Sequence, residues 1–228
     1  MRQGNLYERT LGRILPGDRL LSLLFCFALN SLVYWGGQAM AQGRTLLDMT
    51  TALDRCIPLA PGWAVVYVAA FPMWGLCYVA MARGWDWYRL MTAEVLAKLL
   101  CGVCFLALPT TNVRPEMAGD GFGVWLLEMI YRMDQPLNLF PSIHCLESWL
   151  CFAGLRSRRD VPLLVKGAVL VLAVLICIST VLIRQHVIVD VVVGVLLAEG
   201  MVQLSRKWHW GWRLRGCFTV LGRKFHTR

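Results

Sequence analysis

The fold is decided by the stretch LLVKGAVLVLAVLICISTVLIRQHVIVDVVVGVLLAEGMVQL, residues 163–204. It contains two long apolar runs, 163–183 and 186–204, separated by Arg184 and Gln185. A helix of about 20 apolar residues crosses the roughly 30 Å of hydrocarbon in a bilayer, so each run is long enough to span a membrane. Neither run alternates like a strand, and lipid admits only helices and closed barrels. The stretch therefore predicts a hairpin of two membrane-spanning helices.

Four further apolar runs precede this hairpin, at 20–37, 62–82, 90–109 and 142–156, of which the last is short. The whole chain is 57% hydrophobic and 16% charged, whereas a soluble domain is about half apolar and about a quarter charged. The nine cysteines are interpreted as small buried apolar residues, because most lie inside or beside these runs. The predicted fold class is all-α, a polytopic membrane protein built as a six-transmembrane-helix bundle.

The basic residues predict the orientation of the bundle. If the N-terminus is cytoplasmic, the cytoplasmic segments hold 17 Lys and Arg residues and the opposite side holds five. Such an asymmetry favours cytoplasmic N- and C-termini in a multi-pass protein of the cell membrane. The net charge of +9 then follows from topology and needs no nucleic-acid partner.

Two segments outside the spans are amphipathic. The tail 205–228 interleaves seven basic residues with aromatic ones, which suits the anionic cytoplasmic leaflet, so we divide the chain into a membrane domain, 1–204, and an interfacial tail, 205–228. In the loop 110–141, between the third and fourth spans, apolar residues from Phe122 to Ile130 recur at helical spacing. They predict a short helix that lies on the membrane surface or packs over the bundle.

Two histidines stand at the start of the fourth and sixth runs. His186 and Asp190 are four residues apart, so they share one helix face, where the carboxylate can orient the imidazole and stabilise its cation. The free nitrogen of His186 can then act as a nucleophile towards phosphorus. His144 is placed to protonate the leaving oxygen and then to activate water. Ionisable groups at a bilayer boundary are costly, and this favours a functional site over isolated polar residues.

A phosphoryl group in transfer carries negative charge on three oxygens, so donors should converge on it. Ser142 and the amides that follow Pro141 are candidates, because the first N–H groups of a helix are unpaired. Arg184 and Arg114 are the candidate cations, since both lie on the predicted outer side and guanidinium geometry suits phosphate.

At these residues the chain resembles the type 2 phosphatidic acid phosphatase family, six-helix membrane enzymes related to inositol phosphorylceramide and sphingomyelin synthases. The family signature has three parts: Lys, six residues, Arg-Pro; then Pro-Ser-x-His; then Ser-Arg, five residues, His, three residues, Asp. The second part is intact at 141–144, and the end of the third is intact from His186 to Asp190. The resemblance covers roughly residues 98–195 and the number of spans.

The chain departs from the signature at two cations. Ala107 stands where the family has Lys, and Thr180 stands where it has Arg. Arg184 is expected to replace the second cation. Lys98 could replace the first, although Glu94, one turn away, favours a structural ion pair inside the membrane.

Two further residues are candidates for the surroundings of the site. Glu147 is three residues after His144 on the same helix face and could bind its imidazole, or it could pair with another helix. Ser179 is the serine of the third family motif.

These observations predict an enzyme that dephosphorylates a lipid phosphate, phosphatidate-like or an isoprenoid diphosphate, through a phospho-histidine intermediate. The alternative is a lipid phosphotransferase that passes the phosphoryl group to an alcohol. Less favoured are a proton or ion relay and a metal hydrolase that uses the same histidines and acids. The expected partners are the membrane and the lipid phosphate, with no cofactor and no bound metal, and the sequence gives no indication of an oligomeric state.

Overall fold

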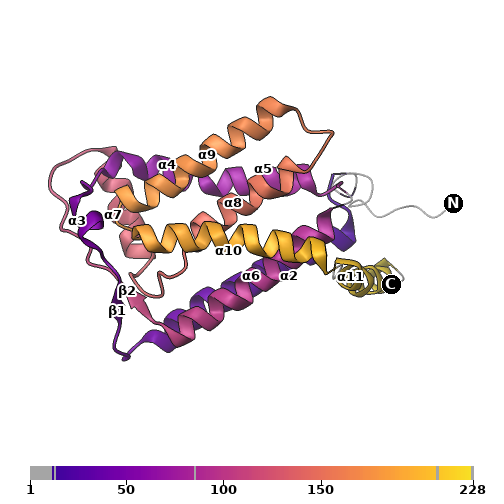
Figure 1. Ribbon diagram of the computed structural model, residues 1–228, viewed down its shortest axis with the longest axis horizontal. Coiled ribbons are helices and arrows are strands. Elements are labelled where there is room, and N and C mark those ends of the chain that lie inside the picture. The colour runs from indigo at the N-terminus through magenta and orange to yellow at the C-terminus, as the bar shows by residue number, and fades with distance from the viewer. Residues whose placement is uncertain (1–11, 13, 85, 209–210, 227–228) are drawn as a thin grey trace.

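The computed structural model describes residues 12, 14–84, 86–208 and 211–226, which form a mostly helical bundle (Figure 1). Five helical stretches are long and apolar enough to cross a membrane. They are α2 (Gly17–Ala41), the run Pro61–Met81, α6 (Trp87–Ala107), α9 (Leu163–Leu182) and α10 (Ile188–Lys207). The run Pro61–Met81 consists of the short 3-10 helix η2 (Pro61–Trp63), α4 (Ala64–Val68) and α5 (Ala70–Met81). The predicted all-α class is thereby confirmed, and five helical stretches are candidates for the predicted spans.

The short fourth apolar run forms α8 (Ile143–Arg156), whose 14 residues extend over about 21 Å. That is less than the hydrocarbon thickness, so the span count of six stays a prediction. Although short, α8 is largely enclosed, since it packs against α5, α9 and α10. Its fully buried side chains include Leu146 and Leu150.

The outer surface of the bundle is apolar. On α2 and α9, large side chains such as Phe27, Leu32, Leu163 and Leu164 are at least two-thirds exposed. A shallow groove along α9 is lined only by aliphatic and small residues. These surfaces suit contact with lipid chains, and the core lies instead around α6, which packs against α2 and α10.

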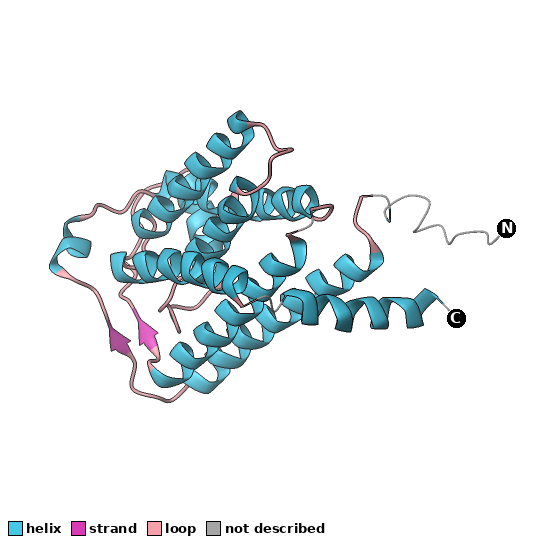
Figure 2. Cartoon of the chain, turned by 45° about the vertical axis from the view of Figure 1, so that its right-hand side comes forward, coloured by secondary structure: helices cyan, strands magenta, loops and turns pink. Residues whose placement is uncertain are grey.

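The connections at one end of the bundle form a cap. It consists of β1 (Leu47–Asp48), α3 (Ala52–Cys56), β2 (Thr110–Thr111) and α7 (Phe122–Met133). Both strands lie at the end opposite the C-terminal helix α11 (Gly211–His226) (Figure 2). The two strands pair in parallel, and the Thr110 hydroxyl accepts hydrogen bonds from the backbone of Leu139 (2.9 Å) and Phe140 (3.0 Å). The cap therefore holds the chain that leads directly into α8.

The helix predicted in the loop 110–141 is present as α7, packed against η2 and α4. Leu127 is buried in that contact, while Phe122, Trp125 and Met133 remain more than half exposed. At the other end, α11 packs against α2 and α6, with the rings of Phe218 and Phe25 5.7 Å apart.

Gly194 permits the close approach of α8 and α10. A Cβ atom added to it would lie 2.6 Å from the backbone oxygen of Ser142, which cannot move without displacing the start of α8.

We expect Gly194→Ala to lower the free energy of unfolding in detergent micelles by about 1–3 kcal/mol, because the added methyl group overpacks this contact. Gly200→Ala is the matched control, since a Cβ at Gly200, on the same helix, meets no atom within 4 Å. It should be neutral or stabilising by up to about 1 kcal/mol. Equal destabilisation by the two substitutions would contradict the close approach.

Candidate active site

Both histidine motifs lie where α8, the end of α9 and the start of α10 meet. The backbone N–H of Ser142 donates to the backbone oxygen of Asp190 (3.1 Å). The backbone oxygen of Thr180 accepts from Gln185 (2.9 Å) and His186 (3.1 Å). Direct main-chain contacts therefore bring the two sequence motifs together.

His186 is held by Asp190. Its Nδ1 lies 3.3 Å from Asp190 Oδ2, and the same oxygen accepts from the backbone N–H of Val187 (3.1 Å). Asp190 is only 1% exposed, and its Oδ2 holds both donors, while its Oδ1 is buried without a hydrogen-bond partner among the described residues. Burial by itself lowers the pKa of His186, but the hydrogen bond and charge of Asp190 outweigh it and hold the pKa above its ordinary value. In the neutral imidazole, a carboxylate at Nδ1 favours the tautomer that carries its proton there, which leaves the lone pair on Nε2.

His144 has a different environment, made by aromatic rings of α4 and α5. Its Nδ1 lies 3.3 Å from the Tyr67 hydroxyl, and the two rings stack with centroids 4.1 Å apart. Phe71 and Trp74 pack around the same imidazole at 5.5 and 5.0 Å. His144 Nε2 is buried and makes no hydrogen bond to any described residue.

Tyr67, Phe71 and Trp74 form an aromatic cage around His144 that the sequence analysis did not predict. The spacing of these residues does contain the information. Together with Tyr78 they are separated by four, three and four residues and so share one helix face. That face lies along α8. Trp74 also donates to the Ser148 hydroxyl (3.1 Å), one turn beyond His144.

Arg114 lies beside the residue that precedes His186. Its Nη2 donates to Gln185 Oε1 (2.6 Å), and its Nη1 donates to the backbone oxygens of Tyr131 (3.4 Å) and Asp134. The guanidinium also covers the Tyr131 ring at 4.4 Å. Burial lowers the pKa of Arg114, and the charge of Asp134 opposes this effect.

The side chain of Arg184 is directed to the cap and makes no hydrogen bond to either histidine within the described part of the chain. Arg184 has a positive φ of 54° and donates to the backbone oxygens of Asp54 and Ile57, both at 2.5 Å. Asp54 in turn accepts from the backbone N–H of Ile188 (2.8 Å), the first residue of α10. In this structure Arg184 therefore fastens α3 to the start of α10, and its role as a phosphate cation stays a prediction.

Lys98 lies inside the bundle with two acids. Its Nζ contacts Glu147 Oε1 and lies 3.8 Å from Glu94 Oε2. Tyr78 also bonds both carboxylates, at 2.8 Å from Glu147 Oε2. The structural ion pair that the sequence suggests is thus present, with Glu147 as a second partner.

Ser179 is fully buried and donates to the backbone oxygen of Ile176 (2.7 Å).

Ser142 begins α8 and is fully buried. Its side chain accepts from the backbone N–H of Cys145 (3.3 Å). The hydroxyl keeps its own proton for donation, and it stands beside the unpaired amides of the first turn.

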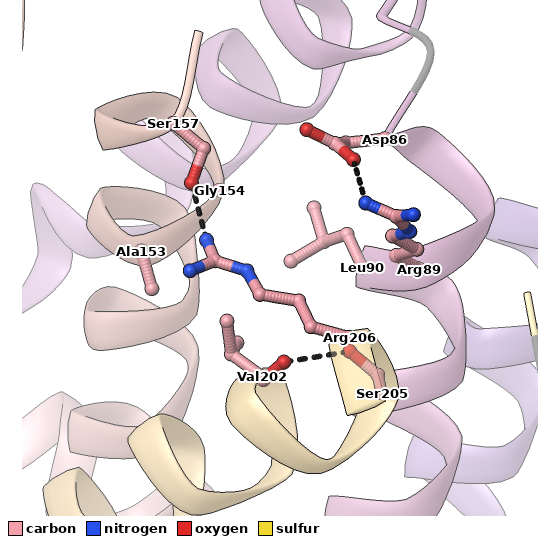
Figure 3. A pocket seen from close by; sticks show the side chains of 9 residues that line it. All are labelled: Asp86, Arg89, Leu90, Ala153, Gly154, Ser157, Val202, Ser205 and Arg206. Carbon is pink, nitrogen blue, oxygen red and sulfur yellow. Dashed lines mark hydrogen bonds and ion pairs between the residues drawn. The ribbon is translucent and has the colours of Figure 1, made fainter. Parts of the chain in front are cut away.

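Other possible sites are distinct from this one. A small pocket between the far ends of α6, α8 and α10 is lined by residues that include Asp86, Arg89, Ser157 and Arg206, and by neither histidine (Figure 3). Within the described part of the chain, no group of three or more His, Cys, Asp and Glu side chains is arranged to hold a metal ion.

Comparison with known proteins gives one finding. Residues 124–214 match the model of the PAP2 superfamily, and this match confirms the resemblance drawn from the two histidine motifs. The matched segment contains α8, α9 and α10 and therefore both histidines. No curated protein and no solved structure matches the chain.

The raised pKa of His186 predicts a pH-dependent stability. A group whose pKa is raised by folding adds stability below its ordinary pKa, and that stability is lost as the pH rises through the raised value. We expect Asp190→Asn to remove this contribution, so that its unfolding temperature in detergent falls further below that of the unmodified protein at about pH 5 than at about pH 8. Asp120→Asn, at an exposed acid, is the control. A deficit that is equal at both pH values would show that Asp190 does not stabilise the cation.

Proposed function

We propose, from the PAP2 superfamily match of the segment that carries both histidines, that this protein is an integral membrane phosphohydrolase of lipid phosphates. The observation that supports the proposal most directly is the His186–Asp190 pair, packed against the helix start that carries His144. Superfamily membership supports a phosphatase-type membrane enzyme, and the steps below are our derivation from the geometry.

In the first step His186 Nε2 attacks phosphorus, and the bond from phosphorus to the lipid oxygen breaks. The attack leaves a positive charge on the imidazole, which the buried Asp190 carboxylate stabilises. His144 donates a proton to the departing lipid alcohol. The products of this step are the free alcohol and a phosphoryl group on His186.

In the second step His144 takes a proton from water, and the water oxygen attacks the phosphoryl group. The nitrogen–phosphorus bond breaks, which releases inorganic phosphate and regenerates both histidines. The aromatic cage suits this role, because Tyr67 fixes the imidazole plane by stacking and by its hydroxyl contact. Asp190 supplies charge to one histidine and the cage supplies none to the other, so the two imidazoles are prepared for different tasks.

The transferred phosphoryl group needs donors around its three oxygens. We assign this role to the Ser142 hydroxyl, the amides at the start of α8 and Arg114, with Arg184 as a further candidate if it exchanges its carbonyl partners for phosphate. Lys98 is assigned a structural role, because its ammonium is engaged by two buried carboxylates.

A lipid phosphotransferase is the second candidate function, because it would use the same phospho-histidine and differ only in the acceptor. The observation that favours it is the absence of two family cations, at Ala107 and Thr180. A mass-spectrometric screen of products from lipid phosphates, with and without diacylglycerol or inositol, tests both candidates. Inorganic phosphate alone supports the hydrolase, and a phosphorylated acceptor supports the transferase.

The position of the site fits our proposed topology. In this arrangement α8 is a sixth, short span, both termini and the tail 205–228 are cytoplasmic, and the active site faces the other side of the cell membrane. The cap of short elements and α11 lie at opposite ends of the bundle, as this topology requires (Figure 1). We propose that the exposed apolar side chains of α7 contact the membrane surface.

The phospho-histidine step can be tested with a lipid phosphate labelled at phosphorus. His186→Ala should abolish both turnover and labelling of the protein, because it removes the nucleophile. His144→Ala should slow turnover by about 100-fold or more and allow label to accumulate on the protein, since hydrolysis of the intermediate loses its base. The measurements are phosphate release and retained label after acid-free gel separation, and full activity in either variant would refute the mechanism.

Tyr67→Phe tests the aromatic cage. The ring remains and the hydroxyl contact to His144 Nδ1 is lost, so we expect kcat to fall about tenfold with a changed alkaline limb of the pH–rate profile. Tyr88→Phe is the matched control, because it removes a tyrosine hydroxyl that bonds Asp18 at the other end of the bundle. Unchanged kcat and pH profile in Tyr67→Phe would show that the hydroxyl does not position His144.

A further inference from the structure

Gln185 is a buried polar side chain that belongs to none of the sequence motifs described above. It is 1% exposed and directly precedes His186. Its Oε1 accepts from Arg114 Nη2 at 2.6 Å, whereas its Nε2 is buried and has no hydrogen-bond partner among the described residues. An unpaired buried amide costs free energy, so this donor is suited to a ligand oxygen.

Arg114 has a second unpaired donor in the same place. Its terminal nitrogens are held by Gln185 and by the backbone oxygens of Tyr131 and Asp134, while its Nε is buried without a partner in the described structure. The amide and the guanidinium are therefore fixed to each other, the amide keeps both N–H groups of its Nε2, and the guanidinium keeps the N–H of its Nε.

The charge around this pair is low. The carboxylate of Asp134 acts electrostatically on both Arg114 and His186 and offsets the single guanidinium. Arg184 donates to backbone oxygens beside the acid Asp54. Lys98 is paired with acids inside the bundle. Apart from His186 and His144, which carry positive charge only when protonated, few cations are thus left to meet the second negative charge of a fully ionised phosphate monoester.

We propose that Gln185 is a phosphate-binding residue which, together with Arg114, makes the pocket select a phosphoryl group that carries one negative charge. This inference rests on the proposed function, because it places the substrate phosphate beside His186. A neutral amide donates a hydrogen bond as a cation does but adds no charge, so a dianion gains less here than in a pocket with additional Lys or Arg.

Two kinds of lipid supply such a group. One is a phosphate monoester that has taken up a proton, since its second pKa is about 6, and the other is a phosphodiester, whose single charge does not change with pH. A pocket of this kind favours the diester over the monoester as the pH rises.

The test compares two non-hydrolysable ligands, decylphosphonate and its monomethyl ester. Between about pH 5 and about pH 9 the free phosphonate gains a second negative charge, while the ester keeps one. Binding is measured by the rise in unfolding temperature of the full-length protein in detergent, which does not require turnover. The ester serves at each pH as the reference for changes in the protein that affect both ligands alike.

We expect the affinity of the free phosphonate, divided by that of the ester, to fall about tenfold or more across this range. A ratio that stays constant or rises with pH would overturn the selection. Because binding is read without catalysis, this outcome is distinct from a failure of the proposed function, which would appear as absence of turnover and of protein labelling.

Substitutions of Gln185 test the residue itself. Gln185→Met keeps the length and removes the donor, so both ligands should bind about tenfold more weakly. Gln185→Lys adds a charge and should reverse the pH trend in favour of the free phosphonate. Gln203→Met, at an exposed glutamine that bonds Glu199 on the opposite end of α10, is the control. If Gln185→Met binds both ligands as tightly as the unmodified protein, Gln185 does not bind phosphate.

Discussion

The main-chain contact between Ser142 and α10 is the constraint on which the site depends. The Ser142 N–H is bonded to the backbone oxygen of Asp190, while its own oxygen faces Gly194 so closely that no side chain fits between them. Because both partners are backbone, the contact fixes the start of α8 against the start of α10 independently of side-chain rotamers. The same two helix starts carry His144 and the His186–Asp190 pair, so the packing of the bundle sets the relation between the two imidazoles.

The cap reinforces this constraint from outside the spans. One loop is tied to the residues before α8 through Thr110, and another is tied to the start of α10 through Asp54 and Arg184. A hydrogen bond is stronger in a low-dielectric environment than in water, so these ties are effective at the end of an apolar bundle. The loops of the first and third connections thus serve the geometry of a site formed by later helices.

Contacts between residues close in the sequence could be predicted, whereas contacts between distant helices could not. The helical class, five of the six predicted spans as candidates, and the His186–Asp190 contact follow from runs and spacings within one segment, and the structure shows these. The partner of His144 lies 77 residues away on another helix, so its spacing from Tyr67 carried no information before the helices were packed. Arg184 was expected beside the phosphate site because it is close in sequence to His186. In the structure its backbone is left-handed and its side chain contacts the backbone at α3. No sequence pattern predicts this backbone conformation.

The buried cluster of Lys98, Glu94 and Glu147 also bears on the site. The two acids hold the Lys98 ammonium in place. If the ammonium moved away from them, it would leave unpaired charges inside a low-dielectric bundle, which costs free energy. Glu147 follows His144 by one turn of α8, and Ser148 on the next position accepts from Trp74 of the aromatic cage. The ion pair fixes α8 to α6, and the Trp74 contact fixes α8 to α5. Together they secure the helix below His144 from two sides, while the aromatic rings hold the imidazole itself, and its buried Nε2 is the atom to which we assign the proton transfers.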